Sequence, residues 1–221
     1  IRQKRLIEAL SNTDLGGIAL NPGPSLTYLT GLHFHLMERP IIVILTSMSS
    51  PVIILPQLEM QKLEGLPFQV MAFPYGEDPG EWGGIARKAI LSLGLEGKRI
   101  GVEPRQMRLL EFNFLRDALT AAEFPDASQV VSRLRITKDS SEVASIRKAV
   151  RMAQNAMEAT LPLIKIGMTE EEIAAELLLQ LLRAGTQPEL SFSPIVSSGP
   201  NSANPHATPS SRKLAAGDLL V

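Results

Sequence analysis

The sequence contains no cysteine, and this absence removes several kinds of chemistry at once. Disulfides, thiolate nucleophiles and cysteine-ligated metal sites are all excluded. Long apolar runs are missing too, because runs such as residues 41–45 (Ile-Ile-Val-Ile-Leu) are far shorter than the roughly 20 residues that cross a bilayer as a helix. No signal-peptide pattern is present. We therefore predict no membrane partner and, in keeping with the lack of cysteine, a cytoplasmic location.

An excess of charge of either sign is also absent. The 221 residues carry 22 basic and 23 acidic side chains, which gives a net charge of −1. Residues 1–132 hold 12 basic and 14 acidic side chains, and residues 133–221 hold 10 and 9. Because neither part is polarised, nothing favours binding to nucleic-acid phosphates or to anionic lipid. The composition is that of a globular protein whose partners are small molecules or proteins.

Four common motifs are missing as well. The sequence has no GxGxxG, no GxxxxGK[ST], no HExxH and no GxSxG. Nucleotide binding and serine-hydrolase chemistry therefore have no support.

The order of apolar segments predicts two domains, as expected for a chain of this length. In the first, strand-like runs alternate with helix-like segments, which indicates an α/β fold with a largely covered sheet. The boundary falls near residues 132–138, and we assign domains to residues 1–134 and 135–221. The expected strands are 18–20, 41–45, 52–55, 68–73 and 99–103, with a closing segment at 130–131, and the expected helices are 2–11, 25–30, 81–93 and 107–119.

Two helices are expected in the second part, each with a capping box at its start. Asp139 is followed three residues on by Glu142, and Thr169 by Glu172, which is the spacing of reciprocal caps. Pro162 should end the first helix. The second helix has an apolar stripe that we expect to be buried, formed by Ile173, Leu177, Leu178, Leu181 and Leu182.

Glu170 and Glu171 lie in the first turn of that second helix. The helix dipole favours carboxylates there. We interpret both as structural, solvated acids and not as catalytic groups.

The last thirty residues hold the main functional candidate, His206. Residues 191–197 are expected to form a short half-buried strand, residues 198–204 a turn-rich loop, and residues 214–221 a turn that leads into a buried strand. His206 follows Pro205, which fixes its own φ, and Pro209 stiffens the exit. A histidine held in this way can donate a hydrogen bond to an anion or transfer a proton near neutral pH. The alternative is a solvated loop histidine without a role.

A second histidine candidate is the pair His33 and His35 in the sequence Thr-Gly-Leu-His-Phe-His. In an extended backbone both side chains would share one face. Two histidines at this spacing could ligate a metal, but no third ligand is evident nearby, and a solvent-facing pair is the alternative.

Five sequence pieces follow one another in the second part of the chain. They are Ile136–Glu142, Gly167–Ile173, Ser191-Phe192, Ser198–Asn201 leading to Pro205-His206, and Gly217-Asp218. In this order they resemble the pita-bread metallopeptidase family, which includes Xaa-Pro aminopeptidase, prolidase, methionine aminopeptidase and creatinase. The residues before them resemble the smaller domain that precedes the catalytic domain in the Xaa-Pro peptidases and creatinase. The resemblance therefore covers the whole chain and corresponds to the first part of a complete family member.

The resemblance implies a creatinase-like N-terminal α/β domain followed by the first part of a pita-bread α+β domain. It also implies that His206 faces the substrate and is catalytic, and that Phe192 lines the apolar wall of the substrate pocket. A core phenylalanine on a strand is the alternative for Phe192. In the family the metal ligands are two aspartates, a histidine and two glutamates, and they would follow Val221. We therefore expect two divalent ions (Mn, Co or Zn) in the complete protein and none in residues 1–221.

The function implied is hydrolysis of the Xaa-Pro bond of peptides or dipeptides by a homodimer. In such a dimer, His33 and His35 are candidates for contacting substrate in the partner's active site. Two alternatives stay open: a creatinase-like amidinohydrolase that needs no metal, and a catalytically silent relative that binds partners. The residues that follow Val221 would distinguish the three.

Overall fold

The computed structural model of the chain describes residues 2–221 and divides into two compact units. Unit 1 extends to Thr137 and unit 2 begins at Lys138. The domain ranges 1–134 and 135–221 stay a prediction.

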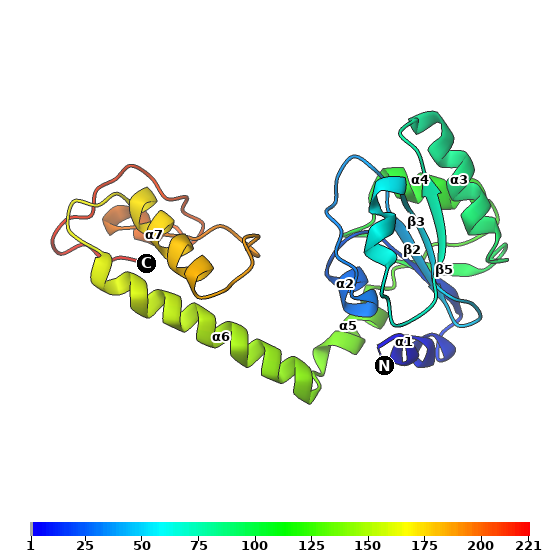
Figure 1. Cartoon of the computed structure of the whole chain (residues 1–221), viewed down its shortest axis with the longest axis horizontal. Helices are drawn as coiled ribbons and strands as arrows, with labels where there is room; N and C mark the ends of the chain where they lie inside the picture. Colours follow the sequence, from blue (N-terminus) through cyan, green and yellow to red (C-terminus); the bar gives the residue numbers. More distant parts are fainter. Residues whose placement is uncertain (1) are drawn as a thin grey trace. The chain divides into compact units, whose positions relative to one another are not determined.

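Unit 1 is built on a mixed five-stranded sheet in the order β4-β3-β2-β1-β5 (Figure 1). The pairs β1–β2 and β2–β3 are antiparallel, whereas β1–β5 and β3–β4 are parallel. Apolar residues face both sides of the sheet, so that Ile18 and Leu20 enter one core and Ala19, between them, enters the other. The strands are β1 (Leu15–Leu20), β2 (Ile42–Thr46), β3 (Val52–Pro56), β4 (Met71–Tyr75) and β5 (Arg99–Val102).

Helices cover both faces of this sheet, which confirms the predicted α/β layers. One face packs against α1 (Arg2–Ser11), α2 (Pro24–Thr30), α5 (Ser128–Ile136) and the short helix η1 (Gln57–Leu63). The other face packs against α3 (Pro79–Leu91) and α4 (Leu109–Ala118) (Figure 1). The continuous apolar runs of β2 and β3 are buried at every position, as expected for strands covered on both sides.

Two elements of unit 1 differ from the sequence prediction. The fourth strand is Met71–Tyr75, shifted toward the C-terminus from the expected 68–73. The expected closing segment at residues 130–131 is part of helix α5. Val131 and Leu134, three residues apart on one helical face, are 1% and 7% exposed and pack into the core beneath α1 and α2.

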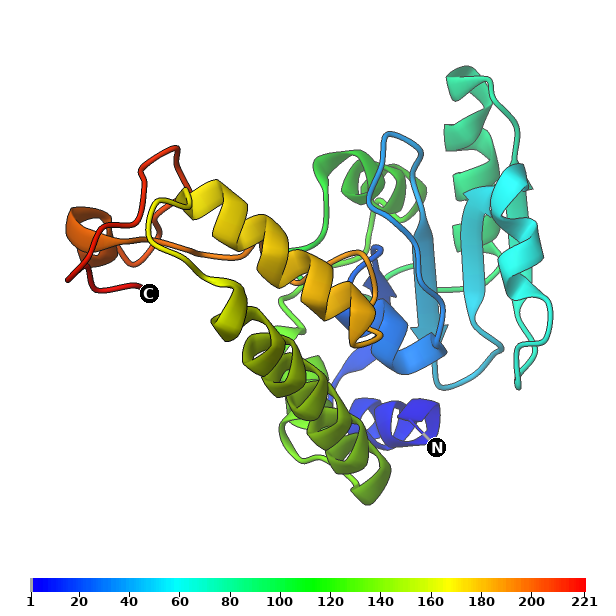
Figure 2. The same cartoon turned by 60° about the vertical axis from the view of Figure 1, so that its left-hand side comes forward.

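Unit 2 begins with a helical hairpin of α6 (Ser140–Thr160) and α7 (Glu170–Arg183), which lie side by side in Figure 2. Both predicted capping boxes are confirmed, with reciprocal bonds between Asp139 and Glu142 and between Thr169 and Glu172. Helix α6 ends at Thr160 as Pro162 predicts, and the short helices η2 (Leu161–Leu163) and η3 (Gly199–Ala203) complete the unit. Across residues 2–221, none of the helices combines the length and the apolar character that crossing a membrane requires.

Three expectations for unit 2 were wrong. Of the stripe expected to be buried on α7, only Ile173 is buried, and Leu182 is 40% exposed. Residues 191–197 form no strand; instead Ser197 exchanges both backbone hydrogen bonds with Val221. Leu219 and Val221 are mostly exposed, so the final segment is not a buried strand. In each case the sequence pattern requires a covering layer that residues 138–221 do not supply by themselves.

Candidate functional site

The candidate site of unit 2 is the segment from Ser198 to Asp218, which carries His206 and folds at the N-terminal end of α7 (Figure 2). Backbone hydrogen bonds hold this segment near both of its ends. Gly199 N–H donates to the Leu219 carbonyl at 2.9 Å, and Leu214 N–H donates to the Met168 carbonyl at 2.8 Å. We call this segment the His206 loop.

The centre of the His206 loop is the carboxylate of Glu170, which is fully buried. Its Oε1 atom accepts from the backbone N–H of Ser198 at 2.6 Å and from the Ser198 hydroxyl at 2.9 Å. Its Oε2 atom accepts from the backbone N–H and the hydroxyl of Ser210 at 3.1 and 2.7 Å. The side-chain amide of Asn201 donates to both oxygens at 3.1 Å. One side chain of α7 thus joins both ends of the loop.

Two opposing effects act on the pKa of Glu170. Burial by itself raises the pKa of a carboxyl group, because it disfavours the charged form. The hydrogen bonds from Ser210, Ser198 and Asn201 outweigh burial and lower the pKa of Glu170 from its ordinary value near 4.5 to about 2. The carboxylate is therefore ionised in the folded protein at neutral pH.

A second charged pair closes the loop beside Glu170. The guanidinium of Arg212 donates to both oxygens of Asp218, at 2.7 and 3.0 Å, and to the Ser198 hydroxyl at 2.6 Å. The hydrogen bonds from Arg212 and from the Ala215 N–H lower the pKa of Asp218. Gly199 packs against this pair with φ +52°, and an added Cβ there would lie 2.6 Å from Arg212 Nη2 and from Asp218 Oδ1. Only glycine fits at this position.

His206 lies at the exposed tip of the loop. Its backbone N–H donates to the Asn204 side-chain oxygen at 3.0 Å, and the next residue, Ala207, donates to the Asn204 carbonyl at 3.1 Å. Ala207 is buried, so the backbone on one side of the histidine is fixed while the imidazole is left outside.

Phe192 lies in a loop and not on a strand, and it is 73% exposed. It is one wall of an open hollow of about 240 Å³ whose exposed surface is polar and apolar in about equal parts. Within unit 2, Phe192 is therefore not a core residue on a strand. The other lining residues are Leu178, Pro188, Leu190, Ser193 and Pro194.

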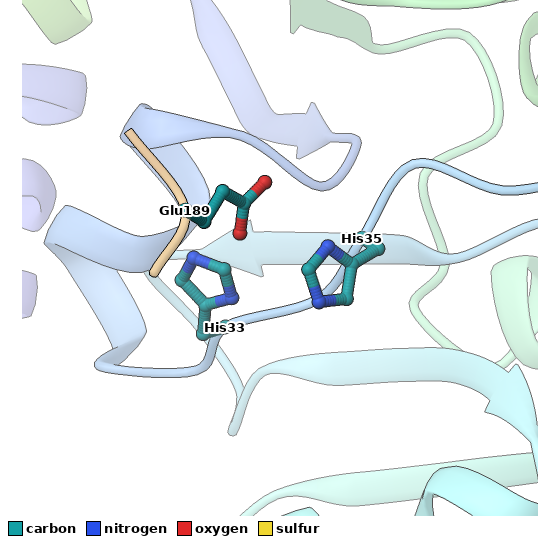
Figure 3. Close-up of side chains that lie close together, drawn as sticks. All are labelled: His33, His35 and Glu189. Carbon is teal, nitrogen blue, oxygen red and sulfur yellow. The ribbon is translucent and has the colours of Figure 1, made fainter. Parts of the chain in front are cut away.

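In unit 1 the two histidines are presented in a similar way. Leu32 and Phe34 are buried, while His33 and His35 between them are exposed on a shared face, as the alternation predicts. The two imidazole rings, labelled in Figure 3, pack edge to face. Their centroids are 5.5 Å apart. Lys62 holds the backbone by donating to the His33 carbonyl at 3.2 Å.

Neither unit taken alone, within residues 2–221, brings three histidine or acidic side chains close enough together to share a metal ion. Glu170 at the start of α7 is buried and Asp218 in the His206 loop is partly buried, and both carboxylates already accept hydrogen bonds from protein donors. The residues inside each unit therefore do not fit a divalent metal pair.

Sequence reasoning selected His206 as a candidate, which stays a prediction, and it misjudged the environment of Glu170, the group that holds the loop. Glu170 was interpreted as structural and solvated; its contacts are structural, but it is not solvated. The capping box at the start of α7 gave a signal for Thr169 and Glu172 only. Nothing in the first-turn pattern separates Glu170 from its exposed neighbour Glu171.

Two family models match the chain. The model described as Creatinase/Prolidase N-terminal domain matches residues 2–137, and the model described as Metallopeptidase family M24 matches residues 144–221. A probable dipeptidase of Mycobacterium tuberculosis is 30% identical over 220 residues, which is 96% of this chain and 56% of that protein.

Solved structures that match the chain also include a dipeptidase and a prolidase. A dipeptidase from Pyrococcus horikoshii matches with a TM-score of 0.88 and 28% identity, over 100% of this chain and 60% of that one. A prolidase from Thermococcus sibiricus matches with a TM-score of 0.88 and 27% identity, over 99% of this chain and 59% of that one. The chain thus spans between 56% and 60% of the length of these three relatives.

The buried carboxylate generates a prediction about pH. Because the pKa of Glu170 is lower in the folded state than its ordinary value, its contribution to stability is complete above about pH 4.5 and is lost as the pH falls through about 2. We expect the difference in the free energy of unfolding between the wild type and Glu170→Gln to be constant from pH 7 to about 4.5. It should then shrink toward pH 2. Urea unfolding at a series of pH values measures it.

The matched control is Glu171→Gln, which removes an exposed carboxylate from the same helical turn. Its effect on unfolding should be small at every pH, because surface charges contribute little. A Glu170→Gln effect that did not change between pH 4.5 and 2 would contradict the account of the network.

Proposed function

The chain belongs to the creatinase/prolidase family of metallopeptidases, with a creatinase-like N-terminal α/β domain and the first part of a pita-bread domain, and from this premise we propose that the complete protein hydrolyses the Xaa-Pro bond of dipeptides or short peptides. Two of the solved relatives are described as a dipeptidase and a prolidase. Their likeness supports a peptide substrate, and the choice of the Xaa-Pro bond is our inference.

The observation that carries this proposal is the exposed imidazole of His206 on a loop whose ends are held by a buried carboxylate. Hydrolysis of an amide passes through a tetrahedral intermediate with negative charge on the former carbonyl oxygen. A donor that is already aimed at that oxygen stabilises the charge without first having to be ordered. In this proposal the His206 imidazole donates to the developing oxyanion or transfers a proton to the leaving amine.

Phe192 supplies the second part of the site in this proposal. The hollow beside it is open, and all of its lining side chains except Ser193 are apolar, which suits contact with an apolar ring. The proline ring of an Xaa-Pro substrate has that character. We assign Phe192 to the wall that receives this ring.

The family name implies divalent metal ions, and we propose a pair of Mn, Co or Zn in the complete protein. Such ions polarise the scissile carbonyl and supply a hydroxide. We propose that their ligands lie in the part of the relatives that this chain does not span.

We expect the complete protein to hydrolyse Xaa-Pro dipeptides and to bind two divalent ions per chain, and residues 1–221 alone to do neither. Both forms are compared in the same dipeptide assay and in calorimetric titrations with Mn²⁺. Tight binding of two ions by residues 1–221 would refute the placement of the ligands. Hydrolysis of creatine instead of a dipeptide would favour an amidinohydrolase, and no activity on either would favour a silent relative.

In the complete enzyme, His206→Ala should lower kcat on an Xaa-Pro dipeptide by roughly a hundredfold, since a donor to an oxyanion contributes about 3 kcal/mol. Metal content should be unchanged, because the imidazole is not a ligand in this proposal. The measurement pairs kcat with elemental analysis of the same sample.

The matched control is Thr208→Ala, which truncates another exposed side chain on the same loop and should leave kcat unaltered. An unchanged kcat in His206→Ala would make the histidine a bystander. Loss of metal in that variant would make it a ligand.

We further propose that the complete protein is a homodimer in which His33 and His35 contact substrate bound to the partner subunit. Sedimentation at micromolar concentration should give a dimer, and a strict monomer would rule the proposal out. Mixing His206→Ala with the double variant His33→Ala, His35→Ala should restore part of the activity. Each mixed dimer then has one site with all three histidines, whereas a site built from one chain would not be restored.

A further inference from the structure

The hydrogen bonds around Glu170 have a fixed direction. The Ser198 hydroxyl has one proton, which it donates to Glu170, and its oxygen accepts from Arg212 at 2.6 Å. The Ser210 hydroxyl likewise donates to Glu170, and its oxygen accepts from the Arg212 backbone N–H at 3.2 Å. Each hydroxyl is therefore oriented by a donor on one side and by the carboxylate on the other.

A glutamine could not replace this carboxylate in the same geometry. Both oxygens of Glu170 receive a backbone N–H and a hydroxyl, so each faces only donors. A side-chain amide has one acceptor and one donor. In either orientation its NH₂ group would meet the donors of Ser198 or of Ser210 and leave them unsatisfied.

A continuous path of hydrogen bonds leads from this carboxylate to His206. The Asn201 side chain donates to Glu170, and the Asn201 backbone carbonyl accepts from the Asn204 N–H at 3.0 Å. The Asn204 side chain in turn accepts from the His206 N–H at 3.0 Å. On the other side of the histidine, Ser210 returns the chain to Glu170.

We propose that Glu170 is a positioning residue that sets the place of the His206 imidazole through Asn201 and Asn204. The inference rests on the proposed function only for its catalytic consequence, because the positioning itself can be measured without activity. Glu170 is enclosed and touches no substrate, so it acts through the histidine. A purely structural role, such as holding the start of α7, is the competing explanation.

The first measurement is hydrogen exchange on the complete protein. In Glu170→Gln, the backbone amides from Ser198 to Ser210, including those of Asn204 and His206, should exchange faster than in the wild type. In Glu171→Gln they should not change. Unaltered exchange in Glu170→Gln would overturn the proposal.

The second measurement is a double-mutant cycle on kcat. A misplaced catalytic group lowers the rate, so Glu170→Gln should reduce kcat by about tenfold to a hundredfold with little change in KM or metal content. Added to His206→Ala, the same substitution should cause almost no further loss. An equal loss in both backgrounds would show that Glu170 acts on the protein as a whole and not through His206.

A milder variant covers the case in which Glu170→Gln fails to fold. Asn204→Ala removes only the last bond of the path and lies at an exposed position. It should lower kcat only when His206 is present, and an unchanged kcat would overturn the proposal.

The proposed function and this inference fail separately. If the unmutated complete protein hydrolyses no Xaa-Pro dipeptide, the proposed function is wrong. Hydrogen exchange then decides the inference alone: faster exchange at Asn204 and His206 supports it, and unchanged exchange refutes it.

Discussion

Unit 2 depends on one buried charge, the carboxylate of Glu170. Transferring an isolated carboxylate from water into a protein interior is strongly unfavourable, so such a group persists only where donors surround it. Here the donors come from residues 28 to 40 positions further along the chain. The requirement to satisfy the carboxylate is therefore also a requirement that Ser198 and Ser210 return to the start of α7. The loop between them gains its shape from this requirement, since it has no sheet or long helix of its own.

The fold could be predicted where local chemistry decides the structure. The apolar runs at 42–46 and 52–56 read as covered strands, and Asp139 and Thr169 mark helix starts by reciprocal capping. The prediction failed where distant contacts decide. Residues 128–136 are helical because Val131 buries against a core assembled from much earlier segments, and 191–197 carry a strand-like sequence without a neighbouring strand to pair with.

The candidate site divides in the same way. His206 could be proposed as a candidate from local features alone, namely the two prolines near it and the family motif that it resembles. Glu170 was misjudged because three consecutive glutamates look alike in the sequence and meet three different environments. Glu170 is buried among donors, Glu171 is exposed, and Glu172 closes the capping box. The local spacing from Thr169 identifies Glu172 as the cap, but only residues far along the chain distinguish the buried Glu170 from the exposed Glu171.

The two histidine loops share one physical arrangement although they belong to different units. In each, neighbouring residues or side chains from elsewhere hold the backbone, and the imidazole itself is left outside: Lys62 binds the His33 carbonyl, and Asn204 binds the His206 N–H. A surface histidine on a mobile loop would lose conformational entropy when it binds a substrate. If the backbone is already fixed in the folded protein, this entropy is lost during folding and not during binding. The packing of a buried core, or the hydrogen bonds to a buried anion, then offset the loss. An exposed imidazole on a clamped backbone is therefore better suited to binding and catalysis than exposure alone would suggest.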